Sequence, residues 1–416
     1  MITLTASFQL LTPAFLGGAD HSAQAIRLTA LKSALRWWWR ALQWAHLDTT
    51  DILAARAILW QREMALFGSA AREEGGAMGG GQGAFLMRLK DSKCAPWHPE
   101  GENPWAPTEN KEDGIAYLLG QGLFAKNKFT RNALRPGTFT VEFLFRPAKA
   151  ERSSQQIAED VEQLSQALWL LCHFGGIGAR ARRGWGSLVF DGSPTLTGLA
   201  DAPQALGPAE SAAQCSAVLG EILSPNQPEK LPPLTAFSSE SLIRCVNYSK
   251  KKPHQVLSVI GKDFKEARRK MQGQDLEKVE NYLRAPADTR VLPARAPCRS
   301  VFGLPHNYFL KKTAETVTIT PASVSDRRAS PLLIHLHRWP NAKLDEYAAI
   351  YSLLPADFLP EDEQVQYAAP RKDPHLVSLP VSEVCSLWEP AKTFMAANLR
   401  TATSIWPAQT IGKVKP

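Results

Sequence analysis

The chain has 416 residues, of which 44% are hydrophobic and 21% are charged. This composition is too apolar for a disordered protein, and the length fits two or three domains. A net charge of +8 makes a polyanionic partner a candidate. No apolar run is long enough to span a membrane, no signal peptide is recognised, and the six cysteines are scattered. We therefore expect a cytoplasmic protein with no membrane partner.

The N-terminal half predicts strands that alternate with helices. Residues 3–10 alternate polar and apolar side chains, as a half-buried strand does, and a helix is expected to begin near Thr29. The later elements are strands at 85–90, 139–145 and 187–190, and helices at 52–67 and 157–172. The order β-α-β-β-α-β, with insertions, is the ferredoxin-like plan of an α+β protein.

A change in composition suggests where the first domain ends. The stretch from Gly192 to Pro233 contains seven prolines and is rich in Ala, Gly and Ser. We therefore predict an N-terminal domain over 1–192, a linker-like segment over 193–234 that carries one short helix, and a C-terminal domain over 235–416. The strands and helices of this second domain are harder to order than those of the first.

A glycine-rich loop at 175–186 reads GGIGARARRGWG. A dinucleotide-binding loop would follow a strand and precede a helix, whereas this loop has the opposite order. Glycines expose backbone amides and arginines bind phosphates, so we predict a phosphate-binding loop; the alternative is a solvated turn whose arginines pair with carboxylates. The residues concerned are Gly175, Gly176, Gly178, Gly184 and Gly186, together with Arg180, Arg182 and Arg183.

The helix that begins near Thr29 carries a second basic feature. Lys32, Arg36 and Arg40 are four residues apart, so they form one row on the side away from the apolar residues. Three consecutive tryptophans follow within the same helix, and they cannot all point inward. We expect Trp38 in the core, whereas either subunit packing or stacking on RNA bases suits Trp37 and Trp39. Trp39 is included among the expected RNA-binding residues.

Positive charge is concentrated in the second domain. Between Arg244 and Lys312, sixteen Lys and Arg residues outnumber six Asp and Glu residues, which gives a local net charge of +10. Such a run is often only a solvated face, but its concentration in one segment predicts a track for a polyanion. Arg327 and Arg328 extend this predicted track.

Residues suited to catalysis are few. Asp20 and His21 lie in the first loop, and His173 precedes the glycine-rich loop. A single histidine is more often structural than catalytic, so we predict no catalytic residue. His335 and His337 alternate along a predicted strand without an evident third ligand, and we therefore expect no metal and no cofactor.

Several segments resemble a known family. TPAFLGGADHSAQAIRLTALKSALRWWWRAL and GGIGARARRGWGSL are similar to the first loop and helix and to the glycine-rich loop of the RAMP superfamily, and in particular of the subunit at the head of type III-B CRISPR (Cmr) effector complexes. FGLPHNYF and RRASPLLIHLHR resemble parts of that subunit's second domain. The resemblance covers about residues 1–190 and 300–340.

This resemblance implies two ferredoxin-like (RAMP/RRM-like) domains with insertions, joined by the Pro/Ala-rich segment. It implies a non-catalytic RNA-binding subunit that caps the head near the 3′ end of the guide RNA. The implied partners are guide RNA (crRNA), target RNA and other RAMP subunits. Backbone RAMP subunits cut RNA with a loop aspartate, but head subunits are not usually assigned that role, so Asp20 is not expected to be catalytic. Two alternatives stay open: a metal-independent endoribonuclease that uses His21 or His173, and a structural capper that binds only protein.

Overall fold

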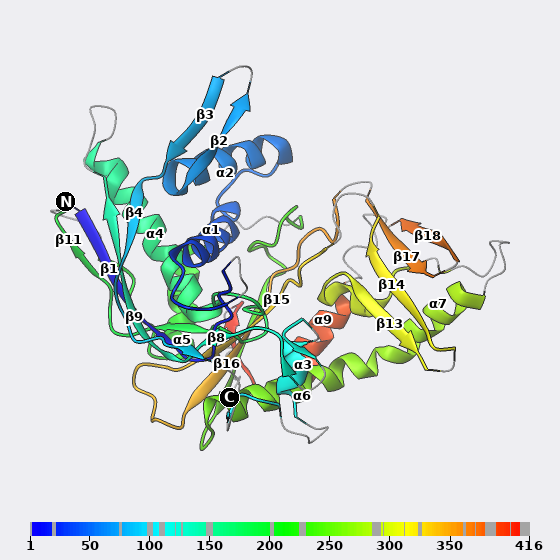
Figure 1. Cartoon of the computed structure of the whole chain (residues 1–416). Coiled ribbons are helices and arrows are strands. Elements are labelled where there is room, and N and C mark those ends of the chain that lie inside the picture. Colours follow the sequence, from blue (N-terminus) through cyan, green and yellow to red (C-terminus); the bar gives the residue numbers. More distant parts are fainter. Residues whose placement is uncertain are drawn as a thin grey trace, which may run out of the picture.

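A computed structural model of the chain contains helices packed on several antiparallel sheets, which confirms the predicted α+β class (Figure 1). Among the described residues, no helix has the length and apolar character needed to cross a membrane. The structure describes residues 2–18, 22–74, 77–97, 103–107, 113–120, 122–125, 128–146, 153–199, 204–223, 230–284, 293, 295–311, 313–322, 327–360, 363–370, 372–378, 388–399 and 401–407.

The first sheet has the predicted ferredoxin-like connectivity. Its strands and helices, in chain order, are β1 (Ile2–Leu10), α1 (Leu28–Trp44), β4 (Phe85–Ser92), β9 (Gly137–Phe145), α4 (Ser154–Phe174) and β10 (Leu188–Phe190). The strands lie in the order β10-β1-β9-β4, with every pair antiparallel. The first and third strands of the unit are therefore central, as right-handed β-α-β crossovers require.

The amphipathic pattern of the sequence explains why α1 and α4 cover one face of this sheet. Strand β1 buries Leu4, Ala6, Phe8 and Leu10 on that face, and the two helices pack against each other over it. Ser153 caps the N-terminus of α4, where its hydroxyl accepts a hydrogen bond from the Gln156 amide. The first connection also contains α2 (Ile52–Phe67), followed by the paired strands β2 (Gly68–Glu74) and β3 (Ala77–Gln82).

The second half of the chain repeats the same connectivity. Its elements are β12 (Leu242–Tyr248), α6 (Pro253–Lys270), β15 (Leu332–His337), β16 (Tyr347–Leu353), α9 (Glu389–Thr393) with the π-helical turn η3 (Phe394–Asn398), and β19 (Thr403–Trp406). The strand order β15-β16-β12-β19 again places the first and third strands in the centre, and all pairs are antiparallel. The chain therefore contains two β-α-β-β-α-β units.

Two insertions in the second unit form a separate sheet, which explains why this half is hard to order from sequence. The first insertion supplies α7 (Gln272–Arg284), the 3-10 turn η2 (Cys298–Phe302), β13 (His306–Leu310) and β14 (Glu315–Pro321). The second supplies β17 (Gln364–Ala369) and β18 (Lys372–Ser378). Strands β14 and β17 pair with each other, so the two insertions build one sheet, β13-β14-β17-β18, at one end of the molecule (Figure 1).

The described parts of segment 193–234 are packed against both units. Strand β11 (Thr195–Thr197) pairs with β1. Helix α5 (Ala212–Ile222), which confirms the predicted short helix, buries Cys215 and Leu219 and packs on β19. The domain boundaries at 192 and 234 stay a prediction. The remaining short elements are β5 (Pro96–Trp97), α3 (Ile115–Leu119), β6 (Phe124–Ala125), β7 (Lys128–Phe129) and β8 (Ala133–Leu134).

The two units meet along the second sheet, whose strand β15 is buried on both faces. Leu333 belongs to the core of the first unit, whereas Leu332, Ile334 and Leu336 belong to a second core beneath α6. An uninterrupted apolar strand is expected where both faces of a sheet are covered. The glycine-rich loop lies at this junction, between α4 and β10 of the first unit and beside β15 of the second.

Candidate nucleic-acid interface

Main-chain hydrogen bonds hold the glycine-rich loop in one shape. Within the loop, the Ile177 amide donates to the Gly186 carbonyl at 2.9 Å. The loop is also joined to the segment after β1, because the Ala179 amide donates to Phe15 at 3.0 Å and the Gly186 amide donates to Pro13 at 3.0 Å. Because these hydrogen bonds fix the loop backbone, the loop presents its side chains from fixed positions.

The predicted loop glycines are required by this backbone. Gly178, Gly184 and Gly186 have φ values of +91°, +81° and +64°, which side chains strongly disfavour. A Cβ on Gly176 would lie 2.6 Å from the Gly186 carbonyl oxygen. A Cβ on Gly175 would lie 2.3 Å from the indole nitrogen of a core tryptophan. The glycines thus have a structural role in shaping the loop, and RNA contact by their amides stays a prediction.

The second unit also anchors the loop. Residues Arg183 and Ile334 form a parallel β-bridge, and the Ile334 amide donates to the Arg182 carbonyl at 3.1 Å. One residue further along β15, His335 donates from Nδ1 to the Gly175 carbonyl at 2.6 Å. The shape of a loop encoded in the first unit therefore depends on a strand of the second.

The three loop arginines have no carboxylate partner among the described residues. Arg180 is exposed and itself adopts a positive φ of +63°. Arg182 is half-buried and donates to the Ser330 carbonyl. Arg183 is half-buried too, with its guanidinium carbon 4.5 Å from the centroid of the Phe264 ring. The carboxylate-paired turn, left open by the sequence, is therefore not what these residues form.

Like charges and burial leave this region strongly positive. Burial lowers the pKa of Arg182 to about 10. Burial, together with repulsion from Arg268 and Arg180, lowers the pKa of Arg183 to about 9. Both side chains are still cations at neutral pH. Water hydrates these partly buried arginines poorly. A bound anion such as a phosphate would therefore be stabilised more by them than by an exposed lysine.

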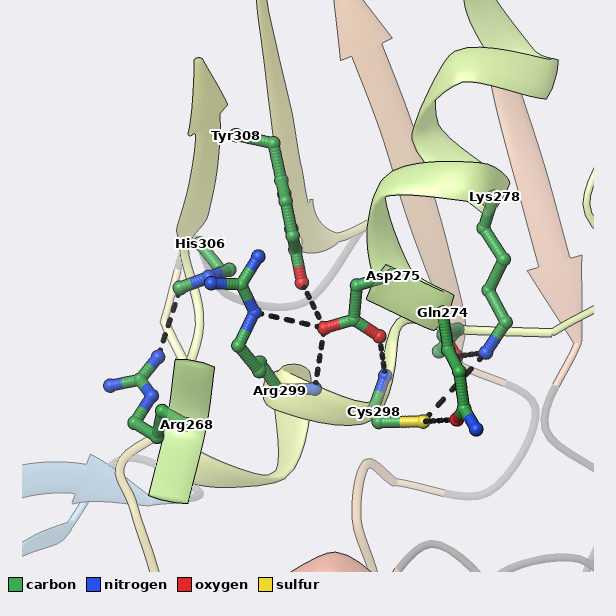
Figure 2. Close-up of polar contacts among 9 residues, drawn as sticks. Arg268, Gln274, Asp275, Lys278, Cys298, Arg299, His306 and Tyr308 are labelled. Carbon is green, nitrogen blue, oxygen red and sulfur yellow. Dashed lines mark hydrogen bonds and ion pairs between the residues drawn. The ribbon is translucent and has the colours of Figure 1, made fainter. Parts of the chain in front are cut away.

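The positive region continues into α6 and the first insertion (Figure 2). Arg268 Nη2 lies 3.3 Å from His306 Nδ1, and its guanidinium carbon lies 5.7 Å from the Phe264 ring centroid. Burial and the neighbouring arginines lower the pKa of His306 to about 3, so this histidine is neutral and accepts from Arg268. Arg268 forms no ion pair among the described residues.

A buried carboxylate beside this cluster already has hydrogen-bond partners. Asp275 is fully buried, accepts from Arg299 Nε at 3.0 Å and from the Tyr308 hydroxyl at 2.8 Å, and also binds two backbone amides (Figure 2). Asp275 therefore compensates Arg299 and not the arginines of α6 or the loop. The count of basic residues in the sequence predicted an excess of positive charge, but it could not show which arginines pair with a carboxylate and which do not.

The two arginines that precede β15 differ in their surroundings. Arg327 is exposed and its charge lowers the pKa of Arg180, after the larger effect of burial. Arg328 is half-buried, and its Nε donates to the Phe358 carbonyl at 2.6 Å while its Nη2 approaches the Asp357 carbonyl at 3.4 Å. These bonds give Arg328 a structural role within the fold, so we do not include it among the proposed RNA-binding residues.

The basic row on α1 exists, but it faces away from the glycine-rich loop. Arg36 Nε lies 2.7 Å and Arg40 Nη1 lies 3.4 Å from the buried carboxylate of Glu63 on α2. Lys32 lies over the Phe85 ring of β4 at 5.9 Å, and burial and Arg36 lower its pKa. The structure thus does not bring this row together with the loop arginines, and it neutralises part of the row's charge.

The prediction that Trp39 stacks on RNA is wrong. Trp39 is fully buried, its ring packs 5.9 Å from that of Phe67, and its Nε1 donates to Gln163 Oε1 at 2.9 Å. Both sides of α1 are covered, by α4 and by α2, so its buried arc is wider than one apolar stripe. Trp38 is in the core as predicted, at 2% exposure.

The half-exposed tryptophan of the three is Trp37, which borders a cavity of about 360 Å³ between α1 and the glycine-rich loop. The guanidinium carbon of Arg182 lies 4.9 Å from the Trp37 ring centroid. The sequence did contain a signal for this surface, because the small residues Ala30, Ser33 and Ala34 share one uncharged helical face with Trp37.

Of the two histidines considered for catalysis, His173 is described, and it is not available to a substrate. His173 is 1% exposed; its Nδ1 donates to the Trp169 carbonyl at 2.7 Å and its Nε2 accepts from the Ala209 amide at 3.0 Å. Burial lowers its pKa to about 4. His21 and Asp20 lie outside the described residues.

A histidine cluster lies beneath the loop. His335 and His337 are buried, with His335 Nε2 3.2 Å from His337 Nδ1, and the ring of His173 lies 5.3 Å from that of His337. Hydrogen bonds to the main chain occupy both ring nitrogens of His173 and Nδ1 of His335. Within the described ranges, no three His, Cys, Asp or Glu side chains are placed to hold a metal ion.

Residues 7–189 match the family model described as the RAMP superfamily. Among solved structures, the chain is similar to Cmr1 from Pyrococcus furiosus in its apo form, with 16% identity, a TM-score of 0.52, and coverage of 98% of this chain and 99% of that one. It also matches a chain of the type III-B Cmr-beta complex bound to cognate target RNA, with 12% identity, a TM-score of 0.46, and coverage of 94% and 99%. No curated protein matches. The likeness to Cmr1 shows a shared fold over nearly the whole chain.

Proposed function

We propose that this protein, whose residues 7–189 match the family model of the RAMP superfamily, is a non-catalytic RNA-binding subunit of a type III-B CRISPR effector complex. In this proposal it caps the head of the complex near the 3′ end of the guide RNA and contacts target RNA and other RAMP subunits. The Cmr1-like fold over both units supports the assignment to such a complex.

The observation that carries RNA binding is the set of cations on and beside the glycine-rich loop. Arg180, Arg182 and Arg183 project from a hydrogen-bonded loop, have no carboxylate partner among the described residues, and adjoin Arg268 and Arg327. Phosphate contacts of this kind favour binding that tolerates sequence and weakens with salt.

The burial of His173 supports a non-catalytic role. A general base must come within hydrogen-bond distance of the ribose hydroxyl that it deprotonates. Both ring nitrogens of His173 are already bonded to the main chain, and its lowered pKa makes it a weak base. The endoribonuclease alternative therefore gains no support from this residue.

Binding of labelled single-stranded RNA to the full chain tests the proposal. We expect an affinity whose logarithm falls with the logarithm of salt concentration, by ~0.7 for each phosphate contact. Combined replacement of Arg180, Arg182 and Arg183 by Ala is expected to reduce both the affinity and this slope. A charge-matched control replaces Arg56, Arg62 and Arg284, which are exposed on α2 and α7.

The same incubation in EDTA separates the alternatives. Cleavage of the RNA would support a metal-independent endoribonuclease and contradict the proposal. Absence of RNA binding by the chain, together with absence of a crosslink between RNA and this subunit in the assembled complex, would support a structural capper. In the assembled complex, crosslinking from the 3′-terminal nucleotide of the guide is expected to label this subunit.

A further inference from the structure

The cavity between α1 and the glycine-rich loop is unusual because small residues form most of its walls. Ala30, Ser33 and Ala34 line it from the helix, and Gly175, Gly176 and Gly178 line it from the loop. Its volume of about 360 Å³ is near the lower end of the range for small-molecule sites. The space therefore suits one planar ring with part of its attached sugar.

The small residues on the loop side cannot be enlarged without moving the backbone. A Cβ on Gly175 would lie 2.3 Å from Trp38 Nε1, and a Cβ on Gly178 would lie 2.8 Å from the Phe15 carbonyl. On the helix side, Ser33 is exposed and lines the cavity, so we expect a larger side chain at this position to need no movement of the backbone. At Gly175 and Gly178, the loop side of the cavity is thus restricted to glycine by close backbone packing, and this absence of side chains leaves the cavity open.

One wall differs from the rest, since it combines an aromatic ring with a cation. The Trp37 ring stands edge-on to Trp38, with centroids 4.7 Å apart and planes at 89°. The Arg182 guanidinium lies 4.9 Å from the Trp37 centroid and is held by its hydrogen bond to Ser330. Indole and guanidinium planes are the groups on which unstacked RNA bases stack. Both are held in place by their neighbours, so little entropy is lost when a base binds.

We propose that this cavity receives a single splayed-out RNA base, which stacks against Trp37 and Arg182. The inference rests on the proposed RNA-binding function and specifies which part of the RNA is held beside the phosphate contacts. Among the described residues, no carboxylate lines the cavity, so these residues do not repel a neighbouring phosphate. In the described part of the lining, Ser33 supplies the one side-chain hydroxyl, which predicts stacking without a strong preference for one base.

Abasic RNA tests this directly, because removal of one base keeps every phosphate. A series of single-stranded RNA oligonucleotides, each with one abasic position, is bound to the full chain. We expect one position at which loss of the base weakens binding by roughly 5- to 150-fold, the range for stacking of one base. In Trp37→Ala and in Ser33→Trp, whose added indole fills the cavity, intact and abasic RNA are expected to bind equally at that position.

Ser33→Trp guards against misfolding, because it adds an indole at an exposed helical position and removes no packed side chain. Gln61→Trp at an exposed site on α2 is the matched control and should discriminate as the unmodified chain does. Salt-dependent binding with no sensitive abasic position, or unchanged discrimination in Ser33→Trp, would overturn the base site and leave the RNA-binding proposal standing. If intact RNA does not bind at all, the proposed function fails as well. Loss of subunit assembly in Ser33→Trp, with abasic discrimination intact, would show that a partner protein occupies the cavity and would also overturn the base site.

Discussion

His335 Nδ1 donates to the carbonyl oxygen of Gly175 at 2.6 Å, so a buried side chain of the second unit holds the first residue of the glycine-rich loop. The bond requires a proton on Nδ1, and His335 Nε2 is then the acceptor for His337 Nδ1 at 3.2 Å. A proton added to Nε2 would break this second bond and place a charge in the core. The loop is therefore connected to a cluster that must stay neutral.

We expect the chain to lose stability as the pH falls from about 6.5 to about 4. In the folded protein, burial lowers the pKa of His173 to about 4 and that of His335 to about 3, whereas an unfolded histidine titrates near 6.5. The unfolded chain therefore binds more protons than the folded chain in this window, which favours unfolding as pH decreases. For His173 alone, the shift corresponds to about 3 kcal/mol.

Denaturant unfolding at a series of pH values measures this effect. His335→Asn keeps a donor near the Gly175 carbonyl but cannot titrate, so its free energy of unfolding should vary less with pH than that of the unmodified chain. Equal pH dependence in the two proteins would show that His335 is not responsible for it.

Trp39 and Trp37 are expected to respond in opposite ways to replacement by Ala. Trp39→Ala removes a buried ring and its hydrogen bond to Gln163, at a cost of about 3–5 kcal/mol. Trp37→Ala removes a half-exposed ring, so stability should fall less while RNA affinity decreases. Thermal melting and RNA titration of both variants test this. A larger stability loss for Trp37→Ala would contradict the packing of α1 described above.

The loss of stability on breaking the ion pairs of Glu63 with Arg36 and Arg40 should depend on which side of the pair is replaced. Replacement of both Arg36 and Arg40 by Ala leaves a buried carboxylate without its cations, and we expect a loss of about 3–5 kcal/mol. Glu63→Gln leaves two half-exposed arginines that water can solvate, so the loss should be smaller, about 1 kcal/mol. Urea unfolding of the two proteins compares these values, and the reverse order would exclude a dominant role for the buried charge.

Two loop glycines with the same sign of φ should differ in their tolerance of Ala. At Gly184 a Cβ finds its nearest neighbour 3.4 Å away, so Gly184→Ala is strained mainly by its φ, at about 1–2 kcal/mol. At Gly186 a Cβ would also lie 2.0 Å from the Ile177 carbonyl oxygen. We therefore expect Gly186→Ala to destabilise the chain more, as measured by its denaturation midpoint. Equal midpoints for the two variants would contradict this loop geometry.

The sequence predicted the first unit well because its elements depend on local periodicity. Residues 3–10 alternate strictly, and the helix now seen as α4 has one long apolar stripe and a Ser153 cap. The second unit was harder because its two insertions pair with each other through β14 and β17, and no local pattern reports that contact. The family resemblance implied a repeated ferredoxin-like unit, but the order of the strands in the second unit came only from their pairing.

For the candidate site, the sequence indicated the loop but not its surroundings. The spacing of Lys32, Arg36 and Arg40 identified a real basic row, yet only tertiary structure shows that Glu63 faces it. The choice of Trp39 over Trp37 failed for the same reason, because a helix covered on two sides has a wider buried arc than its apolar stripe suggests. The proximity of Arg183 to Arg268 joins two units and has no signature along the chain.

The β-bridge between Arg183 and Ile334 has a consequence for the newly made protein. During synthesis, residues 175–186 emerge from the ribosome about 150 residues before the strand that fixes their shape. A nascent or truncated chain that ends before β15 therefore lacks the bonds from Ile334 and His335 to the loop. The loop arginines therefore reach their final arrangement only after β15, and thus most of the polypeptide, has been translated. We expect the loop to bind its ligand only from that point on.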